Sequence, residues 1–408
     1  MKKVWDKWTR IALVKRILVG LILGAILGLT IPGATGISIL GDVFVSALKA
    51  IAPLLVFFLV ISSLCNAGKS HGGVIKTVII LYMFSTVLAA VIAVFASMAF
   101  PVKMTLANAA TDTSAPQGIV EVLNNLLLNV VANPVSSLVN ANYVGILMWA
   151  VLLGLAFRAA DKMTKKVLAD VADGISMVVT WIINLAPFGI FGLVFNTVST
   201  NGLDIFTTYG KLLLLLVGCM LFIYFVTNPL LVYWCIRQNP YPLIFQCLKR
   251  SALTAFFTRS SAANIPVNMK VCEEMGLDRD TYSVTIPLGA TINMDGAAIT
   301  ITVMTMATAF TLGIHVDIPT AIILSLLAAL SACGASGVAG GSLLLIPMAC
   351  SLFGISDDIS MQVVAVGFII GVVQDSVETA LNSSSDLLLS AYAEFRQWRL
   401  EGKEIKFK

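Results

Sequence analysis

Charged residues are scarce in this chain of 408 residues, since Asp, Glu, Lys and Arg together make up only 12% of it. Soluble domains carry about 25%, whereas this sequence is 58% hydrophobic and has a mean hydropathy of +0.94. The scarcity of charge excludes an ordinary soluble domain and predicts a polytopic membrane protein in a lipid bilayer. The net charge of +4 is dispersed over short segments, so no nucleic-acid partner is predicted.

Patterns typical of enzymes and metal proteins are also missing. Only two histidines occur, His71 and His315, both in predicted loops and neither with a partner at ligand spacing. The seven cysteines form no CxxC pair, which favours small core residues over a disulfide framework or a metal site. Without a GxSxG motif or a histidine at membrane depth, an intramembrane hydrolase is disfavoured and no enzymatic activity is predicted.

Eight apolar segments are long enough to cross a bilayer, which takes about 20 helical residues. They lie near 12–31, 43–64, 75–100, 143–160, 172–198, 208–236, 283–313 and 361–390. The first contains Gly20, Gly24 and Gly28, whose spacing is typical of close helix packing and favours an uncleaved helix over a signal peptide.

Basic residues indicate the orientation of these segments. Lys and Arg gather before the first segment and after the second, fourth, sixth and eighth, whereas 32–42 has none and 101–120 only Lys103. The positive-inside rule therefore predicts cytoplasmic termini and an even number of spanning helices. The polar stretch 107–118 is then an outside loop and the least structured part of the chain.

Two further apolar segments are interrupted by polar residues. Residues 241–272 turn polar at Thr258-Arg259-Ser260-Ser261, and residues 319–353 turn polar at SACGASGVAGGS. Both flanks of the first segment are cytoplasmic and both flanks of the second lie outside, so we predict two opposed re-entrant hairpins. Interrupted segments in corresponding positions indicate a transporter binding site at the bilayer midplane. A pore is compatible with one such loop and does not require two of opposite sense.

A stripe of polar residues continues the last apolar segment. Asp375, Glu378, Thr379, Asn382 and Asp386 are spaced 3, 1, 3 and 4 residues apart, which places them on one face of a helix. An ionised carboxylate facing lipid costs several kcal/mol. The stripe is therefore predicted to face the protein interior, water, cations or a cationic substrate.

Other polar residues are candidate partners of this stripe. A buried Arg259 needs a carboxylate, for which Asp375 and Glu378 are the candidates. Asn293 and Asp295 would face nearly opposite ways on a regular helix, so the flanking glycines favour local unwinding and an oxygen-rich site for a hard cation such as Na⁺. The glycine-rich string in 319–353 lacks the βαβ context of a nucleotide site and favours a mobile gate.

Taken together, these motifs resemble the dicarboxylate/amino acid:cation symporter family, which has the glutamate-transporter fold. The markers are TRSSAANIP in 241–272, NMDG in the seventh span, the glycine-rich second hairpin and the D…T..N…D stripe. The resemblance implies an all-α polytopic membrane protein with eight transmembrane helices and two opposed re-entrant hairpins, working as an elevator. It also implies a homotrimer in a bacterial inner membrane.

The resemblance also divides the chain. Scaffold helices occupy 1–73 and, with the outside loop, 107–202; a transport-domain helix occupies 74–106, the transport-domain core 203–396, and a cytoplasmic tail 397–408. Within the core, it assigns hairpin 1 to 241–272, helix 7 to 283–313, hairpin 2 to 319–353 and helix 8 to 361–392.

Carried over residue by residue, the resemblance implies that Asp375 receives the substrate amino group. Asn382, Ser260 and Ser261 would hold the α-carboxylate, with Thr379 beside them. The other implied substrate contacts are Glu378, Arg259, Val338 and Gly340. Three Na⁺ sites are implied: Gly289, Asn293, Asn382 and Asp386; Thr291 with carbonyls near Ala332, Cys333 and Ala335; and Tyr82, Ser85 and Thr86 with Asn293 and Asp295.

Two departures from the family pattern bear on the substrate. Carriers of acidic substrates place an arginine where Glu378 stands and a threonine where Ala297 stands. An acidic side chain would meet a like charge at Glu378, which costs several kcal/mol at low dielectric. Charge alone therefore favours a small uncharged amino acid, with Glu378 either accepting a hydrogen bond from a substrate hydroxyl or neutralising Arg259.

Among the branches of the family, the pattern is most similar to the bacterial serine/threonine:Na⁺ symporters, which implies import of serine and threonine with Na⁺ as the coupling ion. The alternatives are a proton- or Na⁺-coupled carrier of other small neutral amino acids, or of dicarboxylates. The three oxygen-rich clusters favour Na⁺ over protons.

Overall fold

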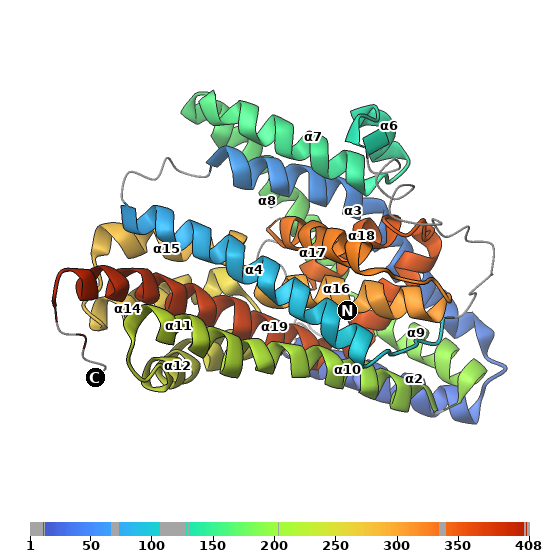
Figure 1. The fold of residues 1–408 in the computed structure, drawn as a ribbon. Coiled ribbons are helices and arrows are strands. Elements are labelled where there is room, and N and C mark those ends of the chain that lie inside the picture. The colour runs from blue at the N-terminus through green and yellow to red at the C-terminus, as the bar shows by residue number, and fades with distance from the viewer. Residues whose placement is uncertain are drawn as a thin grey trace.

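Helices form every regular element in the described part of the chain (Figure 1), as the sequence predicts. The structure is a computed structural model that describes residues 11, 13–66, 73–106, 127–128, 130–202, 204–333, 340–403 and 405. The helices are α2 Leu13–Thr30, α3 Ile39–Asn66, α4 Gly73–Ala99, α6 Pro134–Val139, α7 Tyr143–Ala156, α8 Lys162–Asn184, α9 Ala186–Asn201, α10 Asp204–Phe222, α11 Asn228–Ile236, α12 Tyr241–Cys247, α13 Leu253–Thr258, α14 Ser261–Glu274, α15 Arg279–Ile292, α16 Asp295–Thr311, α17 Ile318–Ala332, α18 Ile346–Ser351 and α19 Asp357–Leu400. The outside loop predicted at 107–118 and His71 lie outside these residues.

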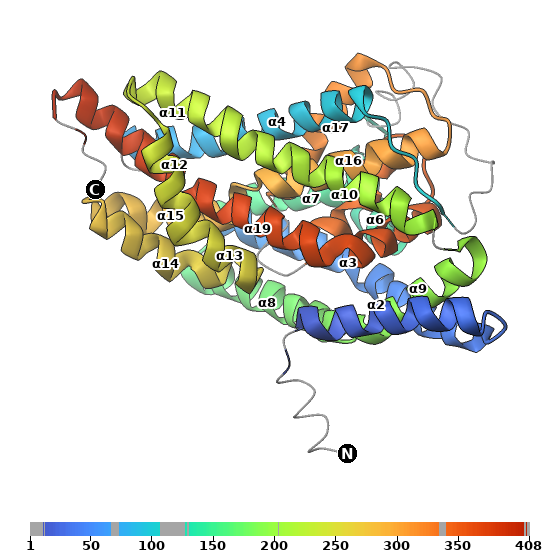
Figure 2. The same cartoon turned by 90° about the horizontal axis from the view of Figure 1, so that it is seen from below.

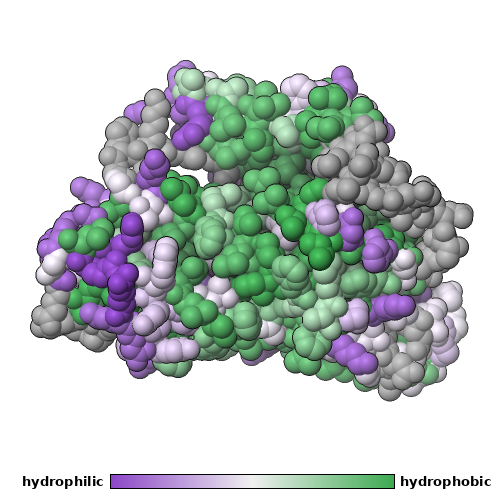
Figure 3. Space-filling view, viewed as in Figure 1, coloured by the Kyte–Doolittle hydropathy of each residue, from purple (hydrophilic) through white to green (hydrophobic). Residues whose placement is uncertain are grey.

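Several of the helices suit a bilayer. Among the described residues, six segments are long and apolar enough to cross a membrane: Thr35–Asn66, Gly73–Ala99, Lys162–Asn184, Phe206–Ile236, Arg279–Thr311 and Asp357–Leu400. Figure 3 shows hydrophobic residues across the middle of one face, with hydrophilic residues gathered toward its left end. These features support the membrane-protein class predicted from composition, whereas the number of eight spans stays a prediction.

The glycines of the first helix mediate close packing, as their spacing predicts. α2 lies against α9, and the two helices run side by side in Figures 1 and 2. A Cβ atom added at Gly24 would lie 2.6 Å from the Phe191 carbonyl oxygen, and one added at Gly28 would lie 2.9 Å from that of Phe195. Only hydrogen atoms fit between the two backbones at these positions.

We expect Gly24→Ala to destabilise the protein, because the added methyl group would push against backbone that cannot rotate away. Overpacking of this kind costs about 1–3 kcal/mol. Thermal unfolding in detergent should show a lower midpoint. The matched control is Gly174→Ala in α8, where an added Cβ meets nothing within 4 Å. An alanine in an open helical position is stabilising, so equal midpoints for both variants would contradict the packing argument.

The fifth span was predicted wrongly as one segment at 172–198. The structure has two helices, α8 and α9, separated at Leu185. Pro187 lies in the first turn of α9 and has no N–H for the helical bond to the Ile183 carbonyl, so the helix breaks there. The basic residues from Lys162 onward, predicted as loop, are helical, because Asp161 accepts a hydrogen bond from the Thr164 N–H at 2.7 Å and caps α8.

The first interrupted segment is a helical hairpin. One arm consists of α12, a π-helical turn at Leu248–Ala252 and α13; α14 returns alongside it (Figure 2). The reversal occurs at Arg259, whose φ of 51° is in the left-handed region, and Ser260 caps α14 by accepting the Ala263 N–H at 3.2 Å. Ala141 and Arg237 share this left-handed conformation, which is costly for residues other than glycine.

The seventh span is broken where the sequence predicts unwinding. α15 ends at Ile292 and α16 begins at Asp295, with Asn293 at φ −99°, ψ 84° and Met294 at φ −122°, ψ 52°. These two residues leave the helical conformation, so Asn293 and Asp295 are no longer forced to opposite faces.

The C-terminal part contains the second interrupted segment and the longest helix. α17 and α18 flank a 3₁₀ turn at Gly341–Leu345, and the tip residues 334–339 lie outside the described residues. α19 covers 44 residues, so the predictions of 361–390 for the span and 361–392 for helix 8 were too short at both ends. Ser356 caps its start by accepting the Ile359 N–H at 3.5 Å.

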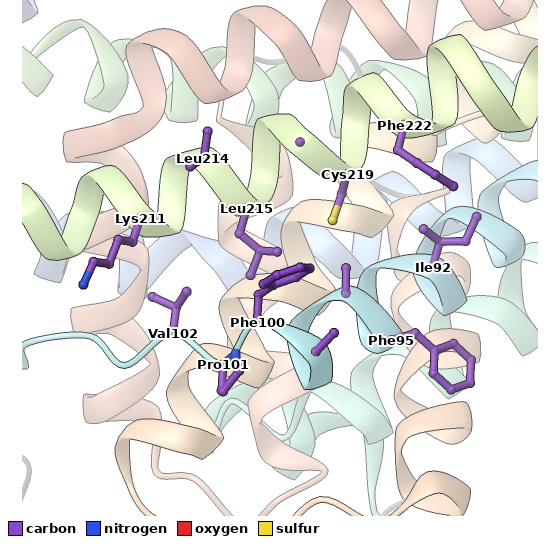
Figure 4. A pocket seen from close by; sticks show the side chains of 13 residues that line it. Ile92, Phe95, Phe100, Pro101, Val102, Lys211, Leu214, Leu215, Cys219 and Phe222 are labelled. Atoms are coloured by element: carbon purple, nitrogen blue, oxygen red, sulfur yellow. The ribbon is translucent and has the colours of Figure 1, made fainter.

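The large apolar groove between α4 and α10 is separate from the polar stripe. Its volume is about 890 Å³, and Figure 4 shows its side chains coming from both helices. The lining includes Phe95, Phe100, Leu214 and Phe222, and Lys211 is the one charged residue among the described lining residues. A groove with so few polar groups has nothing to orient a charged ligand, whereas α19 carries several buried carboxylates.

Candidate functional site

All five polar residues of the α19 stripe are buried, with exposures between 3% and 7% for Asp375, Glu378, Thr379 and Asn382, and 1% for Asp386. The stripe therefore faces the protein interior, as predicted. The described helices that contact α19 include α4, α10, α13, α14, α15 and α16. Leu381, Leu388 and Leu389 of α19 are buried as well, whereas Val377 and Ala380 are only partly buried.

Asp375 contacts both interrupted segments. Its Oδ2 accepts a hydrogen bond from Arg259 Nε and pairs with Arg259 Nη2, both at 2.6 Å, and its Oδ1 accepts the Gly340 N–H at 3.2 Å. Only 11% of the Arg259 side chain is exposed, and Nη2 also donates to the Gly371 carbonyl at 3.4 Å. The charged partner predicted for Arg259 is therefore Asp375.

Glu378 has a different set of partners, so the alternative that it neutralises Arg259 is wrong for this structure. Three donors converge on its Oε2: the Thr300 hydroxyl at 2.7 Å, the Ser342 hydroxyl at 2.9 Å and Gln374 Nε2 at 2.5 Å. They come from α16, from the 3₁₀ turn after the second tip and from α19 itself. A carboxylate that accepts several hydrogen bonds is stabilised in its charged form.

The broken helix packs tightly against the stripe through Gly296. Its N–H donates to Asn382 Oδ1 at 2.7 Å, and a Cβ added at this glycine would lie 3.0 Å from Glu378 Cα. Asn382 Nδ2 also contacts Met294 Sδ at 3.5 Å, whereas the Thr379 hydroxyl donates to the Asp375 carbonyl at 2.8 Å. The NMDG motif is therefore shaped to fit this face of α19.

One predicted cation-binding group is largely assembled. Asn293 Nδ2 donates to Asp386 Oδ1 at 2.9 Å, while Asn293 Oδ1 is buried and has no hydrogen-bond partner in the part of the chain that the structure describes. A Cβ added at Gly289 would lie 2.7 Å from Asp386 Oδ1 and 2.9 Å from the Tyr82 hydroxyl. The contacts of Asn382, the fourth predicted ligand, are instead with Gly296 and Met294.

A second predicted group surrounds Asp295, which is fully buried. The Ser85 hydroxyl donates to Asp295 Oδ2 at 2.8 Å and the Thr86 hydroxyl lies 3.3 Å from Oδ1. The Tyr82 hydroxyl donates to the Asp386 carbonyl at 3.0 Å, and the Thr86 hydroxyl, beside Asp295, also lies 2.9 Å from the Tyr82 carbonyl. The polar patch of the third span therefore contacts both acidic residues, and its role as a cation site stays a prediction.

The third predicted group is described only in part. The Thr291 hydroxyl donates to the Leu288 carbonyl at 2.8 Å, and Cys333 Sγ donates to the Ile292 carbonyl at 3.5 Å. Ala332 is buried at the end of α17. Ala335, together with the predicted substrate contact Val338, lies outside the described residues.

Both hairpin-1 serines lie at the start of α14. Ser260 caps α14, and Ser261 is 5% exposed in the first turn of that helix. No hydrogen bond between these described serines and Asn382 occurs, so the three predicted carboxylate ligands are not joined directly.

Sequence reasoning missed several residues of the site. Gln374, Thr300 and Ser342 surround Glu378, and a separate buried cluster joins Asn264 and Asn268 to Ser383. Gln374 precedes Glu378 by four residues, a spacing that places both on one face. The roles of Thr300 and Ser342 have no such signal, because they come from other elements.

Buried carboxylates between interrupted helices of a membrane protein define a transport protein. The model of the sodium:dicarboxylate symporter family matches residues 13–394, and the chain belongs to this family. A curated relative from Bifidobacterium adolescentis, the serine/threonine transporter SstT, is 58% identical over 406 residues, covering 99% of this chain and 94% of the relative. A Streptococcus thermophilus relative of the same name, from strain LMG 18311, is 56% identical over 400 residues, covering 98% and 100% of the two chains.

Proposed function

We propose that this chain is a secondary active transporter that imports serine and threonine coupled to Na⁺ symport. Membership of a sodium:dicarboxylate symporter family supports Na⁺ as the coupling ion, and the relatives named as serine/threonine transporters support the substrate. The observation that carries the choice of substrate is Glu378, a buried carboxylate with three donors on one oxygen.

The substrate ammonium group would bind at Asp375. In the structure Arg259 occupies this carboxylate at 2.6 Å, so the ammonium group would take over a position held by a guanidinium group. A serine hydroxyl lies three bonds from its ammonium nitrogen. It would therefore meet Glu378, which is one helical turn further along the same face.

Acidic substrates are disfavoured in this arrangement. The Thr300, Ser342 and Gln374 donors support a charged Glu378, and a second carboxylate beside it would be repelled at low dielectric. Hydroxyl, methyl and small apolar side chains carry no such penalty. Asn382, Ser260 and Ser261 would hold the α-carboxylate, with Thr379, Val338 and Gly340 beside the substrate.

Sodium ions would bind where oxygen atoms converge. Asn293 Oδ1, which is buried and has no partner within the described ranges, lies next to Asp386 and the Gly289 backbone and is suited to a hard cation. The Asp295 group with Ser85, Thr86 and Tyr82 offers a second set of oxygens. Thr291 with the carbonyls near Ala332, Cys333 and Ala335 would complete a third.

Transport would follow an elevator mechanism. Eight transmembrane helices and two opposed re-entrant hairpins would be divided into a scaffold, 1–73 and 107–202, and a mobile unit, 74–106 and 203–396, with a tail at 397–408. Asp375 contacts residues of both hairpins, which supports their placement in one mobile unit. The protein would be a homotrimer in a bacterial inner membrane, with both termini in the cytoplasm.

The test is uptake of radiolabelled serine by proteoliposomes, with and without an inward Na⁺ gradient at fixed pH. Wild type is expected to accumulate serine only with Na⁺, and Asp386→Asn is expected to need a Na⁺ concentration at least about tenfold higher, because it removes a charged ligand. Lys211→Gln, in the apolar groove, is the control and should leave the Na⁺ dependence unchanged. Serine uptake driven by a pH gradient in the absence of Na⁺ would overturn the proposal in favour of proton coupling.

A further inference from the structure

Gln374 has an unusual environment for an amide. It is fully buried, and its Nε2 donates both to Glu378 Oε2 at 2.5 Å and to the Thr300 hydroxyl at 2.7 Å. Its Oε1 is buried without a hydrogen-bond partner among the described residues. An ionised carboxylate only accepts hydrogen bonds, so the amide must present its nitrogen to Glu378 and leave its own oxygen unpaired.

An unpaired buried oxygen is unfavourable. An apolar side chain of the same length would fill the position without that cost, so packing alone does not account for a glutamine here. What distinguishes glutamine from such an apolar side chain is the pair of hydrogen bonds that its Nε2 donates to Glu378 and Thr300. Gln374 therefore contributes to this part of the protein through its hydrogen bond to Glu378.

The three donors restrict how Glu378 can turn. Thr300, Ser342 and Gln374 approach the same oxygen, Oε2, from three different elements, and none of their hydrogen bonds goes to Oε1. A carboxylate held through one oxygen keeps a fixed orientation, and its second oxygen remains available as an acceptor.

We propose that Gln374, together with Thr300 and Ser342, is a positioning residue that aims Glu378 Oε1 at the substrate hydroxyl and so sets the preference for serine and threonine over alanine. The inference rests on the proposed function, because it concerns the substrate of that site. Alanine would leave Oε1 unpaired in a desolvated site, and sites built to bind a hydroxyl discriminate strongly against analogues that lack it.

The experiment compares KM and maximal rate for serine and alanine in Na⁺-driven proteoliposome uptake. Gln374→Met keeps the length of the side chain and removes its hydrogen-bond donors. It is expected to raise KM for serine about tenfold, which corresponds to the free energy of one hydrogen bond to a charged group. The KM for alanine should stay unchanged. Gln362→Met, three turns earlier on α19, is the matched control and should keep the wild-type ratio of the two KM values.

A second pair of variants tests the same network at another position. Thr300→Val removes the hydroxyl and is expected to reduce the preference for serine over alanine. Thr300→Ser keeps the hydroxyl and should show the wild-type preference. A purely structural role would change protein yield or the rates for both substrates alike.

The outcomes separate the two proposals. If wild type fails to take up serine, the proposed function is wrong, whatever Gln374 does. If wild type takes up serine with Na⁺ but Gln374→Met and Thr300→Val alter both KM values equally, the positioning role is wrong and the proposed function stands.

Discussion

Asp375→Ala is expected to abolish Na⁺-dependent serine uptake. Asp375 is the predicted counter-charge of the substrate ammonium group and is 3% exposed. Removing one partner of a buried ion pair costs about 3–5 kcal/mol, so substrate affinity should fall by at least about a hundredfold. Uptake of radiolabelled serine into proteoliposomes measures the loss, and uptake equal to that of wild type would exclude the amino-binding role.

This variant also leaves the Arg259 guanidinium without its 2.6 Å partner, so lost uptake alone does not separate binding from folding. Arg259→Gly removes that charge, and glycine accommodates the φ of 51° at this position without strain. The double variant Arg259→Gly/Asp375→Ala should therefore recover the yield of folded protein but not the uptake. Arg259→Gly alone, with Asp375 intact, should still transport serine.

Glu378→Arg is expected to remove serine uptake and to permit inhibition by aspartate. The substitution reverses the charge at this position. Family members that carry acidic substrates have an arginine there. In the structure the carboxylate accepts three hydrogen bonds, with donor-to-oxygen distances of 2.5–2.9 Å. An arginine at this position would place a cation, which cannot accept a hydrogen bond, against the same three donors. Competition by aspartate and by threonine against labelled serine measures the change in substrate class.

Glu378→Gln is the control, because it keeps the shape and removes the charge. Its serine uptake should be reduced by about tenfold, the value of a hydrogen bond to a charged group, without any gain of aspartate binding. Wild-type inhibition by aspartate as strong as that by threonine would show that Glu378 does not exclude acidic substrates.

The contacts of the two carboxylates connect ligand binding with the interrupted segments. Asp375 contacts Arg259 of the first and Gly340 of the second, and Glu378 contacts Ser342 just after the second tip. A ligand that binds between these carboxylates would change the hydrogen bonds that hold both segments to α19. Under the proposed function, substrate binding and movement of the hairpin tips are physically linked.

Local sequence determined the features that depend on composition and spacing. A scarcity of charge indicates a membrane protein, a 3–1–3–4 spacing puts five polar residues on one helical face, and Asn293 with Asp295 between glycines indicates a broken helix. The spacing of Gly24 and Gly28 likewise predicts close helix packing, because glycine has no side chain to keep a neighbouring backbone away. Each of these inferences depends on residues close together in the chain, for which helical geometry is sufficient.

Only the tertiary structure decided which distant residues meet. Arg259 had two carboxylate candidates, and the positions of the hairpin and α19 select Asp375. Glu378 receives Thr300 and Ser342 from 78 and 36 residues away in the chain. Neither hydroxyl has a local signal, because serine and threonine in apolar helices usually bond to their own backbone. The helices must pack before these groups share one carboxylate oxygen, which is why spacing alone did not predict the network around Glu378.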